Sequence, residues 1–223
     1  MEVKEAYRTR VKICGLTNLE DARYVSGALA DYLGFIFYEK SPRYIDPPKA
    51  GAIINWIEGP ETVGVFVNQP LDDVNQVIRQ TGIDLVQLHG TESPDYCRLI
   101  EKPVIKAIHV NDDSDPAGLK KTIRSYSESA AYILFDTKTD NLWGGTGKTF
   151  DWNLLGNPSD EKPFFLSGGL HAGNIREACD TTRPFAVDLS SGVEHAPGVK
   201  DYDKLDRFFE EMREIWELQE EGL

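Results

Sequence analysis

Two residues that can transfer protons stand at the ends of apolar, β-rich segments far apart in the 223-residue sequence. Cys14 ends the segment 11–14, and Asp136 directly follows the apolar run 132–135. If both segments are strands of one sheet that end at the same edge, the thiol and the carboxyl group form an acid–base pair. Taken alone, Cys14 is more simply a small buried apolar residue, and Asp136 is as easily a helix cap or a loop carboxylate.

The residue two positions before Cys14 bears on the protonation state of its thiol. Strand alternation places Lys12 and Cys14 on the same face, with the lysine beneath the cysteine if Cys14 points to the open end of the sheet. A neighbouring ammonium group lowers the pKa of a thiol. The sequence therefore predicts that Cys14 is a thiolate and acts as a base.

Three further polar residues stand at the ends of other apolar segments or just after them. Asp188 either caps the turn that follows it or contacts a sugar hydroxyl. A lone histidine is more often a structural hydrogen-bonding group, so His89, with Gln87 on the same strand face, is predicted to line the site rather than to act in catalysis. Arg43 follows Pro42; a surface arginine is usually solvated, but here it is placed to offer a planar fork to a carboxylate.

Glycine-rich turns recur late in the chain, at residues 143–148, 167–170 and 188–194. Glycine lets backbone amides turn toward a ligand, and successive amides near a short helix start can hold a phosphate. Barrels of alternating strands and helices commonly bind phosphate after strands seven and eight, where two of these turns fall. The three turns together predict a phosphate site.

Eight short apolar segments carry these residues, and segments with helical spacing alternate with them. The predicted strands are residues 11–14, 33–37, 63–67, 85–88, 104–108, 132–135, 164–166 and 186–189. The clearest helix is 202–219, whose apolar residues recur every three or four positions and are predicted to face the core. The pattern predicts an α/β protein with a TIM (βα)8 barrel, a closed parallel eight-stranded sheet whose reactive groups lie at the carboxyl ends of its strands.

Composition sets the remaining expectations. Without a linker or a composition break, residues 1–223 are expected to form a single βα-barrel domain, with 1–10 as an N-terminal extension. The net charge of −13 argues against nucleic-acid or anionic-membrane partners. We see no membrane-spanning apolar run and no secretory signal, so a cytoplasmic location is expected. The three cysteines are too far apart to suggest a disulfide framework or a zinc site.

The motifs as a set, in their order along the chain, resemble the phosphoribosylanthranilate isomerase family of tryptophan biosynthesis. They are VKICGLT (11–17), SPRYI (41–45), GVFVN (64–68), VQLHG (86–90), FDT (135–137), GGTGKTFDW (144–152), LSGGL (166–170), DLSSGVE (188–194) and PGVKD (197–201). The resemblance runs from about residue 11 to the C-terminus, so chance is a poor explanation of it.

The resemblance implies a role for each matching residue. Cys14 corresponds to the general base, Asp136 to the general acid, and Arg43 to the residue that holds the anthranilate carboxylate; Asp188 is implied to hold the sugar hydroxyls. The implied phosphate-binding residues are Gly145, Gly147, Ser167, Gly168, Gly169, Ser190 and Ser191. The implied reaction is an Amadori rearrangement of a phosphorylated small molecule that needs no cofactor and no metal. Monomer and homodimer both stay open.

Two other functions compete with this interpretation. One is another phosphosugar barrel, such as an epimerase or a lyase. A metal-dependent epimerase would gather histidines and carboxylates at strand ends as ligands, and the four histidines do not show that pattern in the sequence. A barrel that only binds a phosphorylated ligand could keep the glycine-rich turns. It would have no need of both Cys14 and Asp136.

Overall fold

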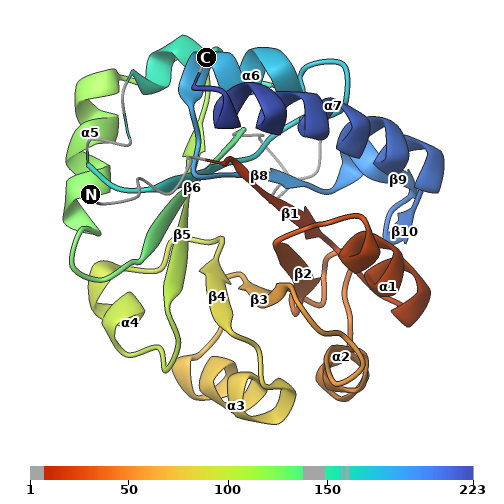
Figure 1. The fold of residues 1–223 in the computed structure, drawn as a ribbon. Coiled ribbons are helices and arrows are strands. Elements are labelled where there is room, and N and C mark those ends of the chain that lie inside the picture. The colour runs from red at the N-terminus through yellow and green to blue at the C-terminus, as the bar shows by residue number, and fades with distance from the viewer. Residues whose placement is uncertain (1–7, 138–148, 157, 159–160, 223) are drawn as a thin grey trace, which may run out of the picture.

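Eight parallel strands close into a barrel in sequence order, in a computed structural model that describes residues 8–137, 149–156, 158 and 161–222 (Figure 1). The strands are β1 (Arg10–Cys14), β2 (Tyr32–Ile36), β3 (Glu61–Phe66), β4 (Leu85–Leu88), β5 (Val104–Val110), β6 (Tyr132–Thr137), β7 (Phe164–Leu166) and β8 (Ala186–Leu189). The sheet closes because β1 pairs with both β2 and β8; Lys12 lies opposite Tyr32 on one side and Asp188 on the other. The predicted TIM (βα)8 barrel is confirmed.

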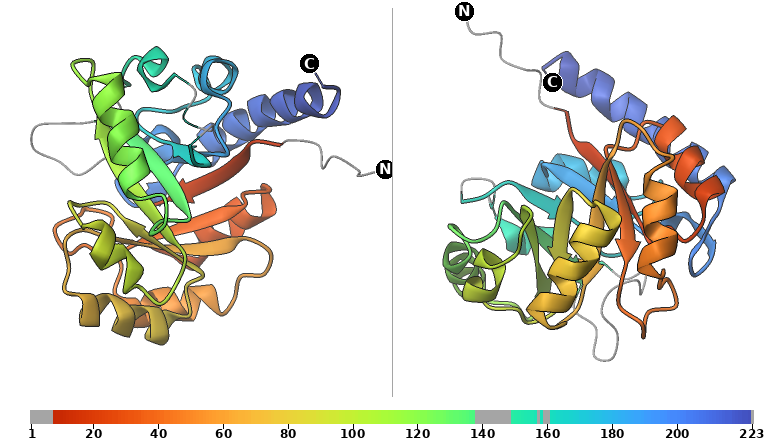
Figure 2. Two further views of the ribbon diagram at one scale, coloured as in Figure 1. Left: turned by 90° about the vertical axis from the view of Figure 1, so that its left-hand side faces the viewer. Right: turned by 90° about the horizontal axis from the view of Figure 1, so that it is seen from below.

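Helices surround the barrel in both views of Figure 2. They are α1 (Leu19–Gly27), α2 (Pro47–Ile54), α3 (Leu71–Thr81), α4 (Pro94–Arg98), α5 (Pro116–Ser125), α6 (Ile175–Thr182) and α7 (Tyr202–Glu220), with short 3-10 turns η1 (Trp152–Leu155) and η3 (Ser191–Val193). The residue just before a helix can determine where the helix begins. The Asn18 side chain accepts a hydrogen bond from the Asp21 amide at 2.8 Å, which caps α1. None of the described helices is both long and apolar enough to cross a membrane.

Strand alternation divides the core into two parts and sets which residues reach the site. Val11 and Ile13 of β1 point outward into the large apolar cluster between sheet and helices, where α7 buries its apolar face as predicted. A smaller apolar cluster, with residues such as Tyr32 and Phe165, lies apart from the first. Lys12 and Cys14, the alternate residues of β1, belong to neither cluster. They share the opposite face of the strand, as predicted.

Residues 8 and 9, which the sequence assigns to an N-terminal extension, contact α7 just before β1 begins. The Thr9 amide donates to Gln219 Oε1 at 2.8 Å, and Trp216 Nε1 donates to the Thr9 carbonyl at 2.7 Å. The Arg8 guanidinium lies 4.0 Å from the centre of the Trp216 ring. These contacts join the first strand to the last helix, whose end lies beside the start of β1 in Figure 2.

Candidate active site

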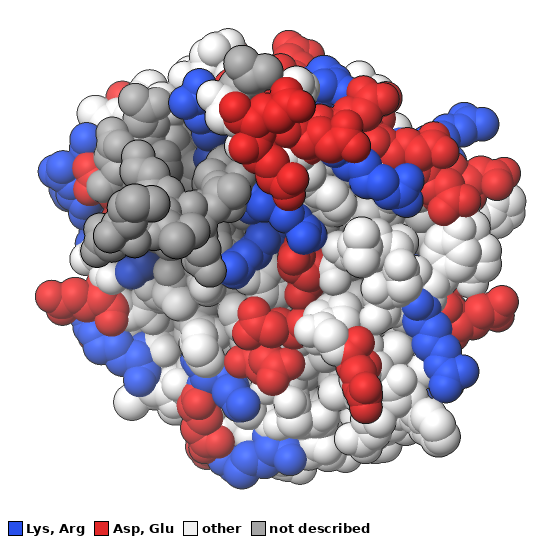
Figure 3. All heavy atoms as spheres, viewed as in Figure 1, with Lys and Arg blue, Asp and Glu red and all other residues white. Residues whose placement is uncertain are grey.

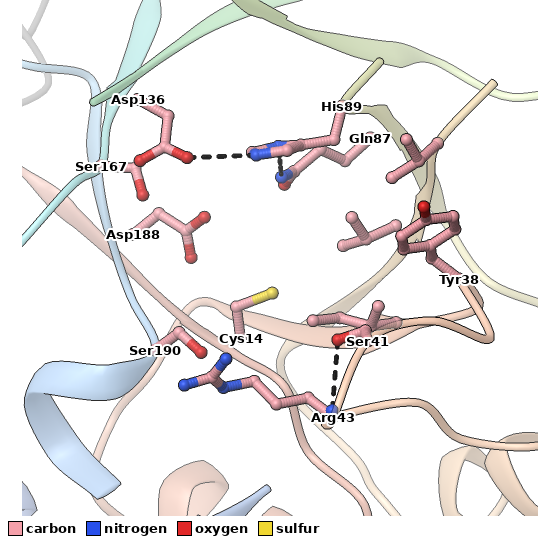
Figure 4. Close-up of a pocket in the computed structure, with 13 residues that line it drawn as sticks. Cys14, Tyr38, Ser41, Arg43, Gln87, His89, Asp136, Ser167, Asp188 and Ser190 are labelled. Carbon is pink, nitrogen blue, oxygen red and sulfur yellow. Dashed lines mark hydrogen bonds and ion pairs between the residues drawn. The ribbon is translucent and has the colours of Figure 1, made fainter. Parts of the chain in front are cut away.

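A pocket of about 540 Å³, partly open to solvent, lies among the carboxyl ends of the strands and the loops that follow them (Figure 4). Most of the predicted site residues that the structure describes line it: Cys14, Arg43, His89, Asp136, Ser167, Asp188 and Ser190. Ile36, Val65 and Val67 add an apolar wall. Residues from β1, β4, β6 and β8 thus meet at one end of the barrel.

Cys14 and Asp136 lie on opposite sides of this one pocket, with Asp188 between them in Figure 4. Cys14 is the last residue of β1, and Asp136 lies near the end of β6. Both are buried, at 6% and 2% exposure, so a ligand in the pocket would contact them away from bulk water. The thiol and the carboxyl group therefore line the same pocket, as their positions at strand ends predict.

The protonation state predicted for Cys14 is corrected by its surroundings. Burial raises the pKa of the Cys14 thiol above its ordinary value, and the charges of Lys12 and Lys200 offset only part of that rise. Lys12 lowers the thiol's pKa less than expected because its Nζ lies 2.8 Å from Asp188 Oδ2. The negative charge of this carboxylate itself raises the thiol's pKa. The expectation of a thiol acidified by Lys12 is therefore wrong in its net direction.

Asp188 has an unused acceptor in the pocket. Its Oδ2 accepts from Lys12, whereas Oδ1 is buried without a hydrogen-bond partner among the described residues. Burial raises the pKa of Asp188 while the Lys12 charge opposes that rise. A buried acceptor without a partner costs free energy, which a ligand hydroxyl would recover.

His89 is bound more closely to the acid candidate than the sequence predicts. Its Nε2 lies 3.1 Å from Asp136 Oδ2, and Gln87 Nε2 lies 3.0 Å from its Nδ1. The direction of both contacts depends on which nitrogen of the ring carries the proton and on the orientation of the Gln87 amide. The backbone amide of Thr137 donates to Asp136 Oδ1 at 2.9 Å. Gln87 and His89 thus orient the Asp136 carboxyl group, and the shared strand face noted in the sequence was the signal for it.

Arg43 reaches the pocket, but one edge of its guanidinium is already occupied. Nε lies 2.9 Å from Glu194 Oε1, and Nη2 lies 2.7 Å from Glu194 Oε2. The Arg43 stem passes Gly15, where a Cβ atom would come within 2.7 Å of Arg43 Cδ. Glu194 is a site residue that the sequence argument missed, although it lies in the DLSSGVE motif.

The turns after β7 and β8 lie next to one another, as the phosphate prediction requires. Ser167 and Ser190 line the same pocket. Gly168 has φ +94°, and a Cβ atom there would lie 2.3 Å from Thr137 Oγ1, so the turn after β7 passes close to the end of β6. Ser191 begins η3, directly after Ser190. The predicted phosphate residues Gly145 and Gly147 lie outside the described residues.

The histidines are closer together than the sequence suggested. The His89 and His109 rings stack edge to face with centres 5.0 Å apart, and His109 Nε2 lies 3.0 Å from the His89 carbonyl. With Asp136 they form a group whose potential ligand atoms all lie within 4.8 Å of one another. The expectation that the histidines do not gather with carboxylates at strand ends is wrong for this pair. Burial lowers the pKa of His109 and favours the neutral ring.

A closed parallel barrel with a thiol, a carboxyl group and an arginine around one pocket defines an enzyme of the acid–base βα-barrel class. The profile of N-(5′-phosphoribosyl)anthranilate (PRA) isomerase matches residues 11–211. The N-(5′-phosphoribosyl)anthranilate isomerase of Acidithiobacillus ferrooxidans is 43% identical over 205 residues, covering 92% of this chain and 97% of that protein. The chain belongs to the N-(5′-phosphoribosyl)anthranilate isomerase family.

Two solved structures extend the comparison. One shows monomers generated from the dimeric phosphoribosylanthranilate isomerase of Thermotoga maritima; it is 41% identical, with a TM-score of 0.79, and covers 96% of this chain and 100% of its own. The other is a phosphoribosylanthranilate isomerase in complex with reduced 1-(o-carboxyphenylamino)-1-deoxyribulose 5-phosphate. It is 40% identical, with a TM-score of 0.79 and the same coverage.

Proposed function

We propose that this chain converts N-(5′-phosphoribosyl)anthranilate to 1-(2-carboxyphenylamino)-1-deoxyribulose 5-phosphate, an Amadori rearrangement in tryptophan biosynthesis. The observation that carries the proposal is the pocket in which Cys14 and Asp136 stand on opposite sides. It is supported by the family to which the chain belongs and by the relative solved with a reduced form of this product. The reaction consists of proton transfers, so its steps need no cofactor.

Two proton transfers carry the rearrangement. Asp136 donates a proton to the furanose ring oxygen, which opens the ring to an iminium. The Cys14 thiolate then removes the proton from the second sugar carbon to give an enolamine. The enolamine becomes the ketone by taking up a proton at the first carbon and losing the proton of the hydroxyl group on the second carbon. Each group contributes about 10²- to 10⁴-fold to the rate. Because burial raises the pKa of Cys14, the thiolate is the minor form in the free protein at neutral pH.

Contacts at the two anionic ends and on the sugar hold the ribose between these groups. Arg43 binds the anthranilate carboxylate, and Asp188 Oδ1 accepts from a sugar hydroxyl. The phosphate is held by the glycine- and serine-containing turns, namely Gly145, Gly147, Ser167, Gly168, Gly169, Ser190 and Ser191. Fixing both ends places the reacting carbon beside the thiol and the ring oxygen beside the carboxyl group. The proton transfers then take place within one complex, without a separate encounter of the reacting groups.

Two finer expectations follow from the proposed reaction. A dianionic phosphate ester does not cross a bilayer unaided, so the enzyme has to work where its substrate is made, which we take to be the cytoplasm. The chain acts as a monomer or a homodimer, since the Thermotoga maritima relative is dimeric.

The decisive test is the loss of fluorescence of N-(5′-phosphoribosyl)anthranilate on addition of the purified protein, with the product identified by mass spectrometry. We expect conversion to the deoxyribulose phosphate at a rate proportional to protein concentration. A rate no faster than spontaneous breakdown of the substrate would refute the proposed function.

A further inference from the structure

Residues 194–200 form a short hairpin of β9 (Glu194–Ala196) and β10 (Val199–Lys200) that carries two buried charges next to the pocket. The Glu194 side chain is 3% exposed and that of Lys200 is fully buried. Neither lines the pocket directly, yet both contact residues that do. A buried charged pair at this place needs an explanation, because apolar residues of similar size would cost less free energy.

Glu194 determines which edge of Arg43 faces the ligand. Its two oxygens bind the edge formed by Nε and Nη2, at 2.7 to 3.0 Å. A guanidinium has five N–H donors, so the two on Nη1 and the second on Nη2 stay available. One N–H of Nη1 and the remaining N–H of Nη2 form the second edge of the fork, which suits a carboxylate. Without Glu194, either edge could turn toward the pocket.

Lys200 links the same carboxylate to the base candidate. Its Nζ lies 3.0 Å from Glu194 Oε1 and donates to the Cys14 carbonyl at 2.6 Å. The backbone amide of Lys200 donates to Asp21 Oδ2 at 3.0 Å, which anchors the hairpin to α1. A continuous chain of contacts therefore runs from Arg43 through Glu194 and Lys200 to the end of β1.

The charges of this chain of contacts favour an anionic ligand. Arg43 and Lys200 share the single carboxylate of Glu194. Burial lowers the pKa of Lys200 and the charge of Glu194 opposes this change; with both basic groups protonated, the three side chains together carry one uncompensated positive charge. Burial by itself raises the pKa of Glu194, but the hydrogen bonds from Arg43 and the charge of Lys200 outweigh it, so the pKa is lowered and the carboxylate is ionised. One ligand carboxylate would neutralise the group.

We propose that Glu194 and Lys200 are positioning residues that make the site selective for a substrate whose aromatic ring carries a carboxylate. Glu194 fixes the Arg43 guanidinium with its Nη1 edge toward the ligand. Lys200 binds both Glu194 and the backbone carbonyl of Cys14, and so keeps the arginine and the cysteine in place relative to each other. The inference rests on the proposed function, since it takes the anthranilate carboxylate as the ligand of Arg43. A ring without the carboxylate would leave the positive charge of the group uncompensated in a buried place.

Two binding probes test the proposal in wild type and in Glu194→Gln. One is reduced 1-(o-carboxyphenylamino)-1-deoxyribulose 5-phosphate, and the other is its phenylamino counterpart without the carboxylate. The wild type should prefer the first. Glu194→Gln should reduce this preference by about tenfold or more, the size of one charge-assisted hydrogen bond, because the guanidinium is no longer fixed.

The sign of the change separates positioning from other roles. If Glu194 only offset charge, its loss would increase the preference for the carboxylate probe. If it only stabilised the fold, both probes would weaken equally. An increased or unchanged preference therefore overturns the proposal. Glu161→Gln is the matched control, because Glu161 binds Arg124 through the same two-pronged contact at 2.9 Å on the exposed surface, and it should leave the preference unchanged.

A measurement on the wild type avoids any folding defect of the variant. With the arginine side chains labelled with ¹⁵N, the Arg43 Nε–H signal should stay in place when the carboxylate probe binds, while the Nη1 signals shift. Movement of the Nε–H signal to a ligand-bound position would mean that the Glu194 contact breaks on binding, which contradicts the proposal. If the wild type fails to convert phosphoribosylanthranilate, the proposed function fails first, so the two failures are distinguishable.

Discussion

In the proposed reaction, Cys14 has to lose a proton in a place that disfavours its charged form. Burial is the largest influence on the pKa of its thiol and raises it, and the Lys12 and Lys200 ammonium groups oppose it. Lys12 itself is held by Asp188. The resting site therefore keeps the thiol protonated at neutral pH, and the thiolate fraction grows as the pH rises toward the raised pKa.

Alkylation of Cys14 by iodoacetamide should thus have a midpoint above pH 9.0, the ordinary value for a thiol. Lys12→Met should shift the midpoint further upward, because it removes a cation that lowers the pKa. Mass spectrometry of the modified peptide as a function of pH measures both effects, and Cys14→Ala identifies background modification. A midpoint below 9.0 in the wild type would show that the cations outweigh burial.

His89 matters because its ring holds the Asp136 carboxyl group at 3.1 Å. His89→Ala should lower kcat by up to about tenfold, the value of one ordinary hydrogen bond, because the acid is no longer oriented. Steady-state kinetics with phosphoribosylanthranilate measure it. His89→Gln, which keeps a donor in the side chain, should recover part of the loss. If His89→Ala is as active as the wild type, Asp136 does not depend on this contact.

At the scale of the elements, the barrel was predictable because eight short, mainly apolar segments alternate with segments of helical spacing. The predicted segments 85–88, 164–166 and 186–189 match β4, β7 and β8 to the residue. β5 and β6 run two residues further than predicted, to Val110 and Thr137. Their polar ends still pair through the backbone, with His109 opposite Asp136. The β9–β10 hairpin has no apolar period and was not predicted.

The candidate site residues likewise divide into those that the sequence predicts and those that it does not. Position at a strand end predicted Cys14, Asp136 and Asp188, because the end of a strand fixes where its side chain lies. Contacts between residues far apart in sequence, such as Arg43 with Glu194, 151 positions away, have no local signature. The direction of the Cys14 pKa shift depends on burial, which spacing along one strand does not reveal.

The last helix is the element whose packing is most directly testable. Phe208 on α7 is fully buried in the cluster between helices and sheet. Phe208→Ala should lower the free energy of unfolding by about 3–5 kcal/mol through lost burial and the cavity left behind. Urea unfolding followed by circular dichroism measures it, with the exposed neighbour Arg207→Ala as the control. A loss similar to that of the control would show that α7 is not packed as described.

At the scale of the whole molecule, an acidic protein has to receive an anionic substrate. The net charge is −13, and acidic side chains gather over α7 in Figure 3. The pocket differs from that surface, because Arg43 lines it and Lys12 and Lys200 lie buried beside it. Charges separated by more than ~8 Å are largely screened at physiological salt, so a ligand experiences mainly the charged groups around the pocket and not the acidic side chains over α7.

The central claim is that Cys14 and Asp136 transfer protons to and from one bound sugar phosphate. Single-turnover fluorescence decay of phosphoribosylanthranilate, with protein in excess, tests it most directly in wild type, Cys14→Ala and Asp136→Asn. Each variant should lose about 10²- to 10⁴-fold in rate while still binding reduced 1-(o-carboxyphenylamino)-1-deoxyribulose 5-phosphate. A full wild-type rate in either variant would contradict the claim, whatever the other variant does.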